Sequence, residues 1–369
     1  MSRAQAWPAH LGAQLRVLLA LAAGFDRPPF SRATRALAGT AHADEVELGG
    51  TPASLYRPAR SAGPWPAVLV VPGVTRSGRR HPAFVGVGRG LAAAGILAVV
   101  VEPPGLTVGE LTPESLAHVR AAAEALSSRA DVRGGRFALA GVSGGATLAL
   151  LVAGRPGLAE RVSVVAALAP CCDIREALRL VTTDRYRRDG ELALFRPGPF
   201  LRLVLARSAI AWLEEGGDRR ALRDHVLGLE DYGEEPLRAL RSWPTEGLGG
   251  EALAIVSLLG NEDPTRFDEL CDRLPAALRE VTETLSPTRV AGGVTAPIEL
   301  VVGRADKYVP LEDAVAFARA CPRARLTVIE SLEHAVPHVS PAAARDLARL
   351  DGVVVRFLAA ACSSSYSEG

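Results

Sequence analysis

The sequence predicts an α/β fold, with a mostly parallel central sheet flanked by helices and one inserted helical segment. Three observations support this class. Apolar runs of strand length recur along the chain, and helical stretches separate them. This alternation stops after residue 170 and resumes near residue 291. The chain has 369 residues and 48% hydrophobic content, which is enough for a core domain and a sizeable insertion.

The first part of the core is expected to begin with a hairpin, because residues 44–57 alternate apolar and polar side chains around a Gly-Gly turn. The strands that follow are apolar on both faces, which is typical of a parallel sheet covered by helices on both sides. We expect strands over residues 66–73, 96–105, 136–141 and 161–170, and helices over residues 81–95, 113–129 and 143–154.

The segment from about residue 173 to residue 289 has helical patterning throughout and more charge. We interpret residues 171–290 as an inserted helical segment, with charged stretches such as DRYRRDG as turns between its helices. The core is expected to resume with strands over residues 296–303 and 324–330 and helices over residues 310–322 and 340–361. The domains expected are an N-terminal helical arm (1–43), a core in two parts (44–170 and 291–369, the latter ending in a disordered tail) and the inserted helical segment.

The N-terminal segment contains a short apolar stretch, Leu15–Phe25, that resembles the hydrophobic part of a signal peptide. Arg16 interrupts this stretch, which is also too short to span a bilayer. We therefore expect a docked helical arm and a cytoplasmic protein with no integral membrane span. Export, or association with a membrane surface through this helix, stays open as the alternative.

The composition excludes several classes of function. The chain has 42 basic and 41 acidic residues, whereas nucleic-acid binding needs a basic excess or stripe, so we expect no nucleic-acid partner. The chain has five cysteines, an odd number and too few for a disulfide framework. The adjacent pair Cys171 and Cys172 is either redox-active or, more commonly, two small buried side chains. No cluster has zinc spacing, so no metal or other cofactor is expected.

One short motif carries the chemistry. Gly141, Ser143 and Gly145 match G-x-S-x-G between an expected strand and an expected helix. In this strand–turn–helix the serine adopts a strained backbone conformation, and a Cβ atom at either glycine would collide with the neighbouring strand or helix. The N-terminus of the helix directs backbone N–H groups at developing negative charge. Ser143 is therefore a candidate nucleophile.

A serine hydroxyl needs a base, and the base needs an orienting acid. The candidate acid is Asp306, after the strand that ends near residue 302, and the candidate base is His334, after the strand that ends near residue 330. All three side chains follow carboxyl ends of strands and are expected at one edge of the sheet. Asp173 is the alternative acid, and His338 is the alternative base.

These segments together resemble the α/β-hydrolase superfamily. The resemblance rests on Pro72-Gly73-Val74, GVSGG, VVGRADKYVP and LEHAVPH, and covers roughly residues 44–170 and 291–360. It implies a helical lid and an oxyanion hole made by the amides of Gly144 and of Val74, with Thr75 as the alternative to Val74. The chain departs from many members in having Pro72-Gly73 where they have His-Gly, and in lacking an HGGG signature.

The resemblance and the residues together predict a serine hydrolase that cleaves a carboxylic ester or related small acyl compound through an acyl-enzyme. Two alternatives remain: an acyltransferase of the same fold, and a binding protein of this fold without catalysis. His81, close to the loop after the first core strand, is expected either in a solvated turn or in contact with substrate. Glu102, Glu330 and Glu333 are expected at the surface or supporting the site.

Overall fold

The structure is a computed structural model that describes residues 43–59, 61–227, 229, 237–337 and 342–363. The predicted N-terminal arm and polar tail lie almost entirely outside this range, as does His338. Among the described residues, no helix combines the length and the apolar character that crossing a bilayer requires.

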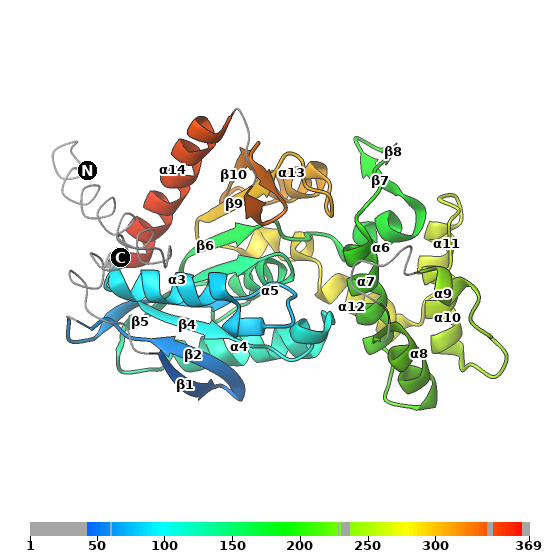
Figure 1. Cartoon of the computed structure of the whole chain (residues 1–369), viewed down its shortest axis with the longest axis horizontal. Coiled ribbons are helices and arrows are strands. Elements are labelled where there is room, and N and C mark those ends of the chain that lie inside the picture. Colours follow the sequence, from blue (N-terminus) through cyan, green and yellow to red (C-terminus); the bar gives the residue numbers. More distant parts are fainter. Residues whose placement is uncertain (1–42, 60, 228, 230–236, 338–341, 364–369) are drawn as a thin grey trace.

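An eight-stranded sheet forms the centre of the molecule, with the strand order β1-β2-β4-β3-β5-β6-β9-β10 (Figure 1). Strand β2 runs antiparallel to β1 and to β4, and the remaining neighbours are parallel. This confirms the predicted fold class. The strands are β1 (Ala43–Leu48), β2 (Thr51–Tyr56), β3 (Trp65–Val71), β4 (Leu97–Val101), β5 (Val132–Val142), β6 (Val162–Leu168), β9 (Ile298–Gly303) and β10 (Ala324–Ile329).

The predicted hairpin is confirmed by β1 and β2, which pair in register from Ala43 with Tyr56 to Leu48 with Thr51. Its two turn residues, Gly49 and Gly50, have φ angles of 58° and 75°. Two consecutive positive φ angles give the turn the twist that joins antiparallel strands, and glycine adopts them without steric cost.

Helices cover both faces of the sheet because the central strands are apolar on both faces. In β3, Val68 and Val70 pack with Phe84 and Phe357 on one face, and Leu69 belongs to the larger cluster on the other. The helices of the core are α3 (Pro82–Ala93), α4 (Pro113–Ser127), α5 (Gly144–Ala153), α13 (Leu311–Ala320) and α14 (Ala343–Cys362). Helices α3 and α14 cover the first face, and α4 and α5 cover the second (Figure 1).

The chain between β6 and β9 forms a separate group of helices beside the core, drawn in green and yellow in Figure 1. Its helices are α6 (Ile174–Thr183), α7 (Pro199–Ala211), α8 (Gly217–Leu227), α9 (Arg238–Arg241), α10 (Gly250–Leu259), α11 (Phe267–Asp272) and α12 (Ala276–Thr284).

The expectation that this insertion is helical throughout was wrong. A two-stranded hairpin, β7 (Arg185–Arg188) and β8 (Glu191–Leu194), lies between α6 and α7. Its turn residues Asp189 and Gly190 have φ angles of 50° and 91°. Asp-Gly is a common two-residue hairpin turn, so the sequence carried the signal, but we interpreted it as a connection between helices.

An ion-pair network fastens α6 to α11 within the insertion. Asp268 accepts hydrogen bonds from the guanidinium groups of Arg179 (2.6 Å), Arg175 (2.9 Å) and Arg187 (2.9 Å). Arg179 is almost fully buried and stacks on the ring of Phe267, with 4.3 Å from its guanidinium carbon to the ring centroid. The hydrogen bond from Arg179 lowers the pKa of the Asp268 carboxyl to about 2.

We expect Asp268→Asn to lower the melting temperature at pH 7 by roughly 1–4 °C, because a neutral amide binds three arginines less well than a carboxylate does. The folded-state pKa lies below the unfolded value, so the advantage of the wild type is complete above about pH 4 and declines as the pH falls towards 2. Thermal unfolding of both proteins at pH 7, 4 and 3 measures this, and a difference in melting temperature that does not change with pH would contradict it.

Candidate active site

Ser143 lies at the tip of the sharp turn between β5 and α5, with φ 53° and ψ −126°. Residues with a side chain rarely adopt a positive φ, so the turn holds Ser143 in a strained conformation. The backbone N–H of Ser143 donates to the carbonyl of Leu168 at the end of β6 (2.8 Å). The strained strand–turn–helix expected from the sequence is therefore present.

The glycines beside Ser143 are required by close packing. A Cβ atom at Gly145 would overlap the carbonyl oxygens of Val71 and Pro72 at the end of β3, and a Cβ atom at Gly141 would overlap the backbone of Ala146. Both contacts would be closer than real Cβ atoms approach, which confirms the steric reason given for these two glycines.

Asp306 and His334 meet at the carboxyl edge of the sheet. The Nδ1 atom of His334 lies 2.8 Å from Oδ2 of Asp306, and the other carboxylate oxygen accepts the backbone N–H groups of Tyr308 (2.8 Å) and Val309 (3.1 Å). The Asp306 side chain is almost fully buried, and that of His334 is 14% exposed. A carboxylate can only accept a hydrogen bond, so Nδ1 of neutral His334 carries the proton and its Nε2 is unprotonated.

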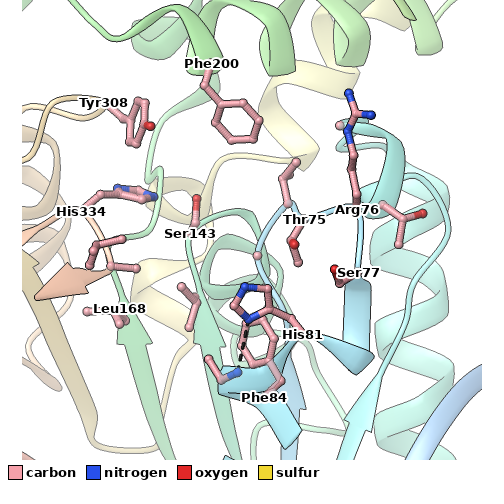
Figure 2. A pocket seen from close by; sticks show the side chains of 18 of the residues that line it. Thr75, Arg76, Ser77, His81, Phe84, Ser143, Leu168, Phe200, Tyr308 and His334 are labelled. Carbon is pink, nitrogen blue, oxygen red and sulfur yellow. Dashed lines mark hydrogen bonds between the residues drawn. The ribbon is translucent and has the colours of Figure 1, made fainter. Parts of the chain in front are cut away.

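His334 lies in a tight turn that the sequence did not reveal. Strand β10 ends at Ile329, and a short hairpin of β11 (Leu332–Glu333) and β12 (Val336–Pro337) follows it. His334 occupies the turn with φ 55°, and its ring meets that of Tyr308 edge to face at 4.9 Å between centroids. Figure 2 shows the His334 ring extending towards the side chain of Ser143.

Ser143 and His334 line the same cleft, which has a volume of about 970 Å³ (Figure 2). The loop after β3 forms one wall through Val74 and Thr75, and Phe200 of α7 enters it from the insertion. A second, much smaller chamber of about 50 Å³ also reaches Ser143 and His334.

The comparisons with known proteins bear on the fold. No family model matches the sequence, and no curated protein matches it significantly. Pyrococcus horikoshii acylaminoacyl peptidase superimposes with a TM-score of 0.53 at 12% identity, over 92% of this chain and 45% of that protein. Dipeptidyl peptidase 4 of Porphyromonas gingivalis gives a TM-score of 0.51 at 13% identity, over 90% of this chain and 37% of that protein. The chain has the α/β-hydrolase fold. This chain corresponds to less than half the length of either enzyme.

In this α/β-hydrolase fold the loop after β3 crosses close to the nucleophile turn. A Cβ atom at Gly73 would lie 2.9 Å from the carbonyl oxygen of Val142 and 3.3 Å from Cβ of Ser143, and one at Gly144 would lie 3.7 Å from the Val74 side chain. Gly144 begins α5, so its N–H belongs to the first helical turn, which has no intrahelical acceptor. The two residues expected to form the oxyanion hole are thus neighbours, and Thr75 lies beside them.

The alternative acid has another task in this fold. Asp173 caps α6, where its carboxylate accepts the backbone N–H of Glu176 (3.1 Å) and the hydroxyl of Thr288 (3.5 Å). The alternative base, His338, lies outside the described residues. Of the two candidate bases, the structure therefore places only His334 relative to Ser143.

His81 lies at the start of α3 and at the large cleft, and its contact with substrate stays a prediction. Its Nδ1 accepts the backbone N–H of Ala83 (3.3 Å) and so caps α3, while its ring lines the large cleft (Figure 2). Among the acidic residues, Glu102 accepts the N–H of Arg79 (3.1 Å). Glu330 forms an ion pair with Arg304 at 2.6 Å, and Glu333 forms one with Lys307 at 3.2 Å. The side chains of both pairs are partly exposed.

Cys171 and Cys172 are both free thiols, and burial raises the pKa of each well above the usual value. A protonated thiol is a poor nucleophile, which favours the interpretation of these two as small packed side chains. No group of three or more His, Cys, Asp or Glu residues in the described ranges is arranged to hold a metal ion.

Several cleft residues were missed from the sequence. Phe200 and Arg207 belong to the insertion, and their place at the cleft depends on how α7 packs over the core. Tyr308 follows Asp306 by two residues in the acid segment, so its proximity to the site could have been inferred from that spacing. Phe200 and Tyr308 also contact each other, with 6.0 Å between ring centroids.

We expect Gly145→Ala to destabilise the protein by about 1–3 kcal/mol and to displace Ser143, because the added methyl group overlaps two backbone carbonyls. Gly144→Ala is the matched control for stability. Its methyl group would meet side-chain carbons no closer than 3.7 Å, and alanine favours the helix. Thermal unfolding of the two variants checks this, and equal melting temperatures would contradict the packing argument.

Proposed function

We propose that the chain is a serine hydrolase that cleaves a carboxylic ester or related acyl compound through an acyl-enzyme. The observation that carries the proposal is the Asp306–His334 hydrogen bond, which directs Nε2 of His334 into the cleft that the strained Ser143 also lines. The proteins of this fold named above are peptidases, which supports hydrolysis of an acyl derivative.

The proposed first step forms the acyl-enzyme. Oγ of Ser143 attacks the substrate carbonyl carbon while Nε2 of neutral His334 accepts the hydroxyl proton. Asp306 stays ionised and stabilises the imidazolium, and its second oxygen is held by two loop amides so that the carboxylate cannot rotate away. The imidazolium then gives its proton to the leaving oxygen, and the bond from the carbonyl carbon to that oxygen breaks.

The negative oxygen of the tetrahedral intermediate would be bound by the backbone N–H groups of Gly144 and Val74. Each such donor contributes roughly 3–4 kcal/mol to stabilisation of the transition state in enzymes of this kind. Water then attacks the acyl carbon while His334 accepts a proton from it. The imidazolium returns this proton to Oγ of Ser143 as the bond from the acyl carbon to Oγ breaks, which releases the acid and the free serine.

The inserted helices, residues 171–290, are proposed to act as a lid over this site. Phe200 of α7 projects into the cleft above Ser143 (Figure 2). An apolar cover reduces access of bulk water and strengthens the electrostatic interactions beneath it.

We expect Ser143→Ala to lower kcat/KM for p-nitrophenyl esters by roughly 10⁴- to 10⁶-fold, because the variant lacks the nucleophile that forms the proposed acyl-enzyme. Ser128→Ala, at an exposed position after α4, is the matched control and should retain wild-type turnover. A fluorophosphonate probe should label the wild type and the control but not Ser143→Ala.

Three outcomes would redirect the proposal. Ester hydrolysis that survives in Ser143→Ala would exclude Ser143 as the nucleophile. An unlabelled wild type with no turnover would favour a binding protein without catalysis. Acyl transfer to an added alcohol or amine that outpaces hydrolysis would favour an acyltransferase, because the same acyl-enzyme then meets an acceptor other than water.

We expect Asp306→Asn to lower kcat by about 10⁴-fold, because the amide no longer fixes the Nδ1–H tautomer of His334. Asp173→Asn is the matched control, since it removes the charge of the alternative acid at the cap of α6. This control should lose some thermal stability and keep its turnover. The reverse pattern in initial-rate measurements would make Asp173 the orienting acid.

A further inference from the structure

Two spaces of very different size meet at Ser143, and this inference rests on the proposed function. The large cleft has a volume of about 970 Å³, and the small chamber has a volume of about 50 Å³. Phe200 and Tyr308 line both of them and therefore form the boundary between the two. A substrate that straddles Ser143 must place one part in each space.

The small chamber has an apolar lining. Leu201 and Leu205, one helical turn apart on α7, face it together with Ile174 of α6. Ile174 is fully buried, and Leu205 is 3% exposed. The chamber therefore accepts hydrocarbon and offers little to a polar or charged group.

The walls of the chamber are held by hydrogen bonds to backbone groups. The hydroxyl of Thr147 bonds both the N–H (3.1 Å) and the carbonyl (2.9 Å) of Cys171, and the hydroxyl of Ser286 accepts the N–H of Ile174 (2.9 Å). The Asp313 carboxylate accepts the N–H of Cys172 at 2.7 Å. This wall cannot move outwards without breaking several buried hydrogen bonds, so its position limits the size of the substrate group that fits in the chamber.

The opposite wall is fastened in the same way. The backbone N–H of Leu111 donates to the hydroxyl of Ser208 (2.9 Å), and the indole N–H of Trp212 donates to the carbonyl of Leu111 (2.9 Å). Leu111 of the core is thereby tied to α7 of the insertion. A volume of 50 Å³ between two fixed walls holds about four water-sized groups, which is the length of a short acyl chain.

The direction of the substrate follows from the position of His334. The leaving oxygen must lie on the side of His334, which protonates it. His334 itself lines both spaces, but Ala335 and Val336, which follow it directly, line the large cleft and not the chamber, so the leaving group extends into the cleft and the acyl chain enters the chamber.

Beside polar side chains such as Arg76 and His81, the large cleft is lined by exposed apolar ones. Val336 is 67% exposed, Val87 is 43% exposed and Val108 is 39% exposed, and all three line the cleft. Exposed apolar side chains beside a binding site favour a bulky apolar leaving group. Burying these side chains against an apolar group lowers the free energy, whereas contact with a polar group does not.

We infer that the substrate class is an ester of a short acyl chain, of about four carbons or fewer, with a bulky apolar alcohol. Leu201 of the insertion and Cys171 after β6 both line the chamber and set the limit on acyl length. The reaction is the one proposed above, and no further reactant is needed.

The acyl limit is tested with p-nitrophenyl acetate, butanoate, hexanoate and octanoate. We expect the wild-type kcat/KM to fall by roughly tenfold or more between butanoate and octanoate. Leu201→Ala should raise the octanoate-to-butanoate ratio by about tenfold, and Cys171→Leu should move the preference to acetate. Leu347→Ala, at a position 65% exposed on α14, is the matched control and should leave the ratios unchanged.

The alcohol side is tested with phenyl, 2-naphthyl and 4-biphenylyl acetates, whose leaving groups have similar acidity. We expect kcat/KM to rise by about tenfold along this series and Val336→Asp to remove most of the rise. Leu347→Asp is the control for an added charge on an exposed leucine.

The inference is overturned if wild-type octanoate turnover equals that of butanoate, or if neither chamber variant alters the acyl ratios. A flat response to alcohol size overturns the assignment of the large cleft. These results differ from failure of the proposed function, in which Ser143→Ala would keep the activity of the wild type whatever the ester.

Discussion

Helix α5 packs so closely against the end of β3 that only a hydrogen atom fits at Gly145, and the position of Ser143 depends on this contact. The turn before the helix must then pass through a positive φ at Ser143, which sets the side chain above the sheet edge. The same packing brings the loop after β3 beside Gly144, a proximity that the proposed oxyanion hole requires. The strain at Ser143 is sustained by the buried sheet around it.

A second constraint is that the two oxygens of the Asp306 carboxylate have different hydrogen-bond partners. One oxygen of Asp306 is held by the amides of Tyr308 and Val309, and the other holds His334. Rotation of the carboxylate would break these bonds together, so the imidazole is oriented by a group that is itself fixed. His334 adds to this with a positive φ in a tight turn, which the ring of Tyr308 flanks.

The insertion contributes shape to the same site. Helix α7 provides Phe200 and Leu201, which border the small chamber, while β3, β5, β9 and β10 lead to the residues that are proposed to carry the chemistry. In the proposed mechanism, reactivity and substrate choice therefore reside in different parts of the chain. The hydrogen bonds between Leu111 and α7 join the two parts, so a change in the packing of the insertion is expected to alter which acyl chains fit without altering the proposed proton transfer.

The amino-acid pattern alone predicts the fold class, the hairpin, the order of the core strands and helices, and the steric need for Gly141 and Gly145. The first three follow from local periodicity, and the last follows from the G-x-S-x-G motif between a strand and a helix. The sequence also placed Asp306 and His334 after strands, and topology brings such positions to one edge of a sheet. It did not determine the β7–β8 hairpin, where an Asp-Gly turn fits either reading, nor the two cavities. Their sizes depend on how the residues of α7, distant in sequence from Ser143, pack over the core, and only the tertiary structure decides that.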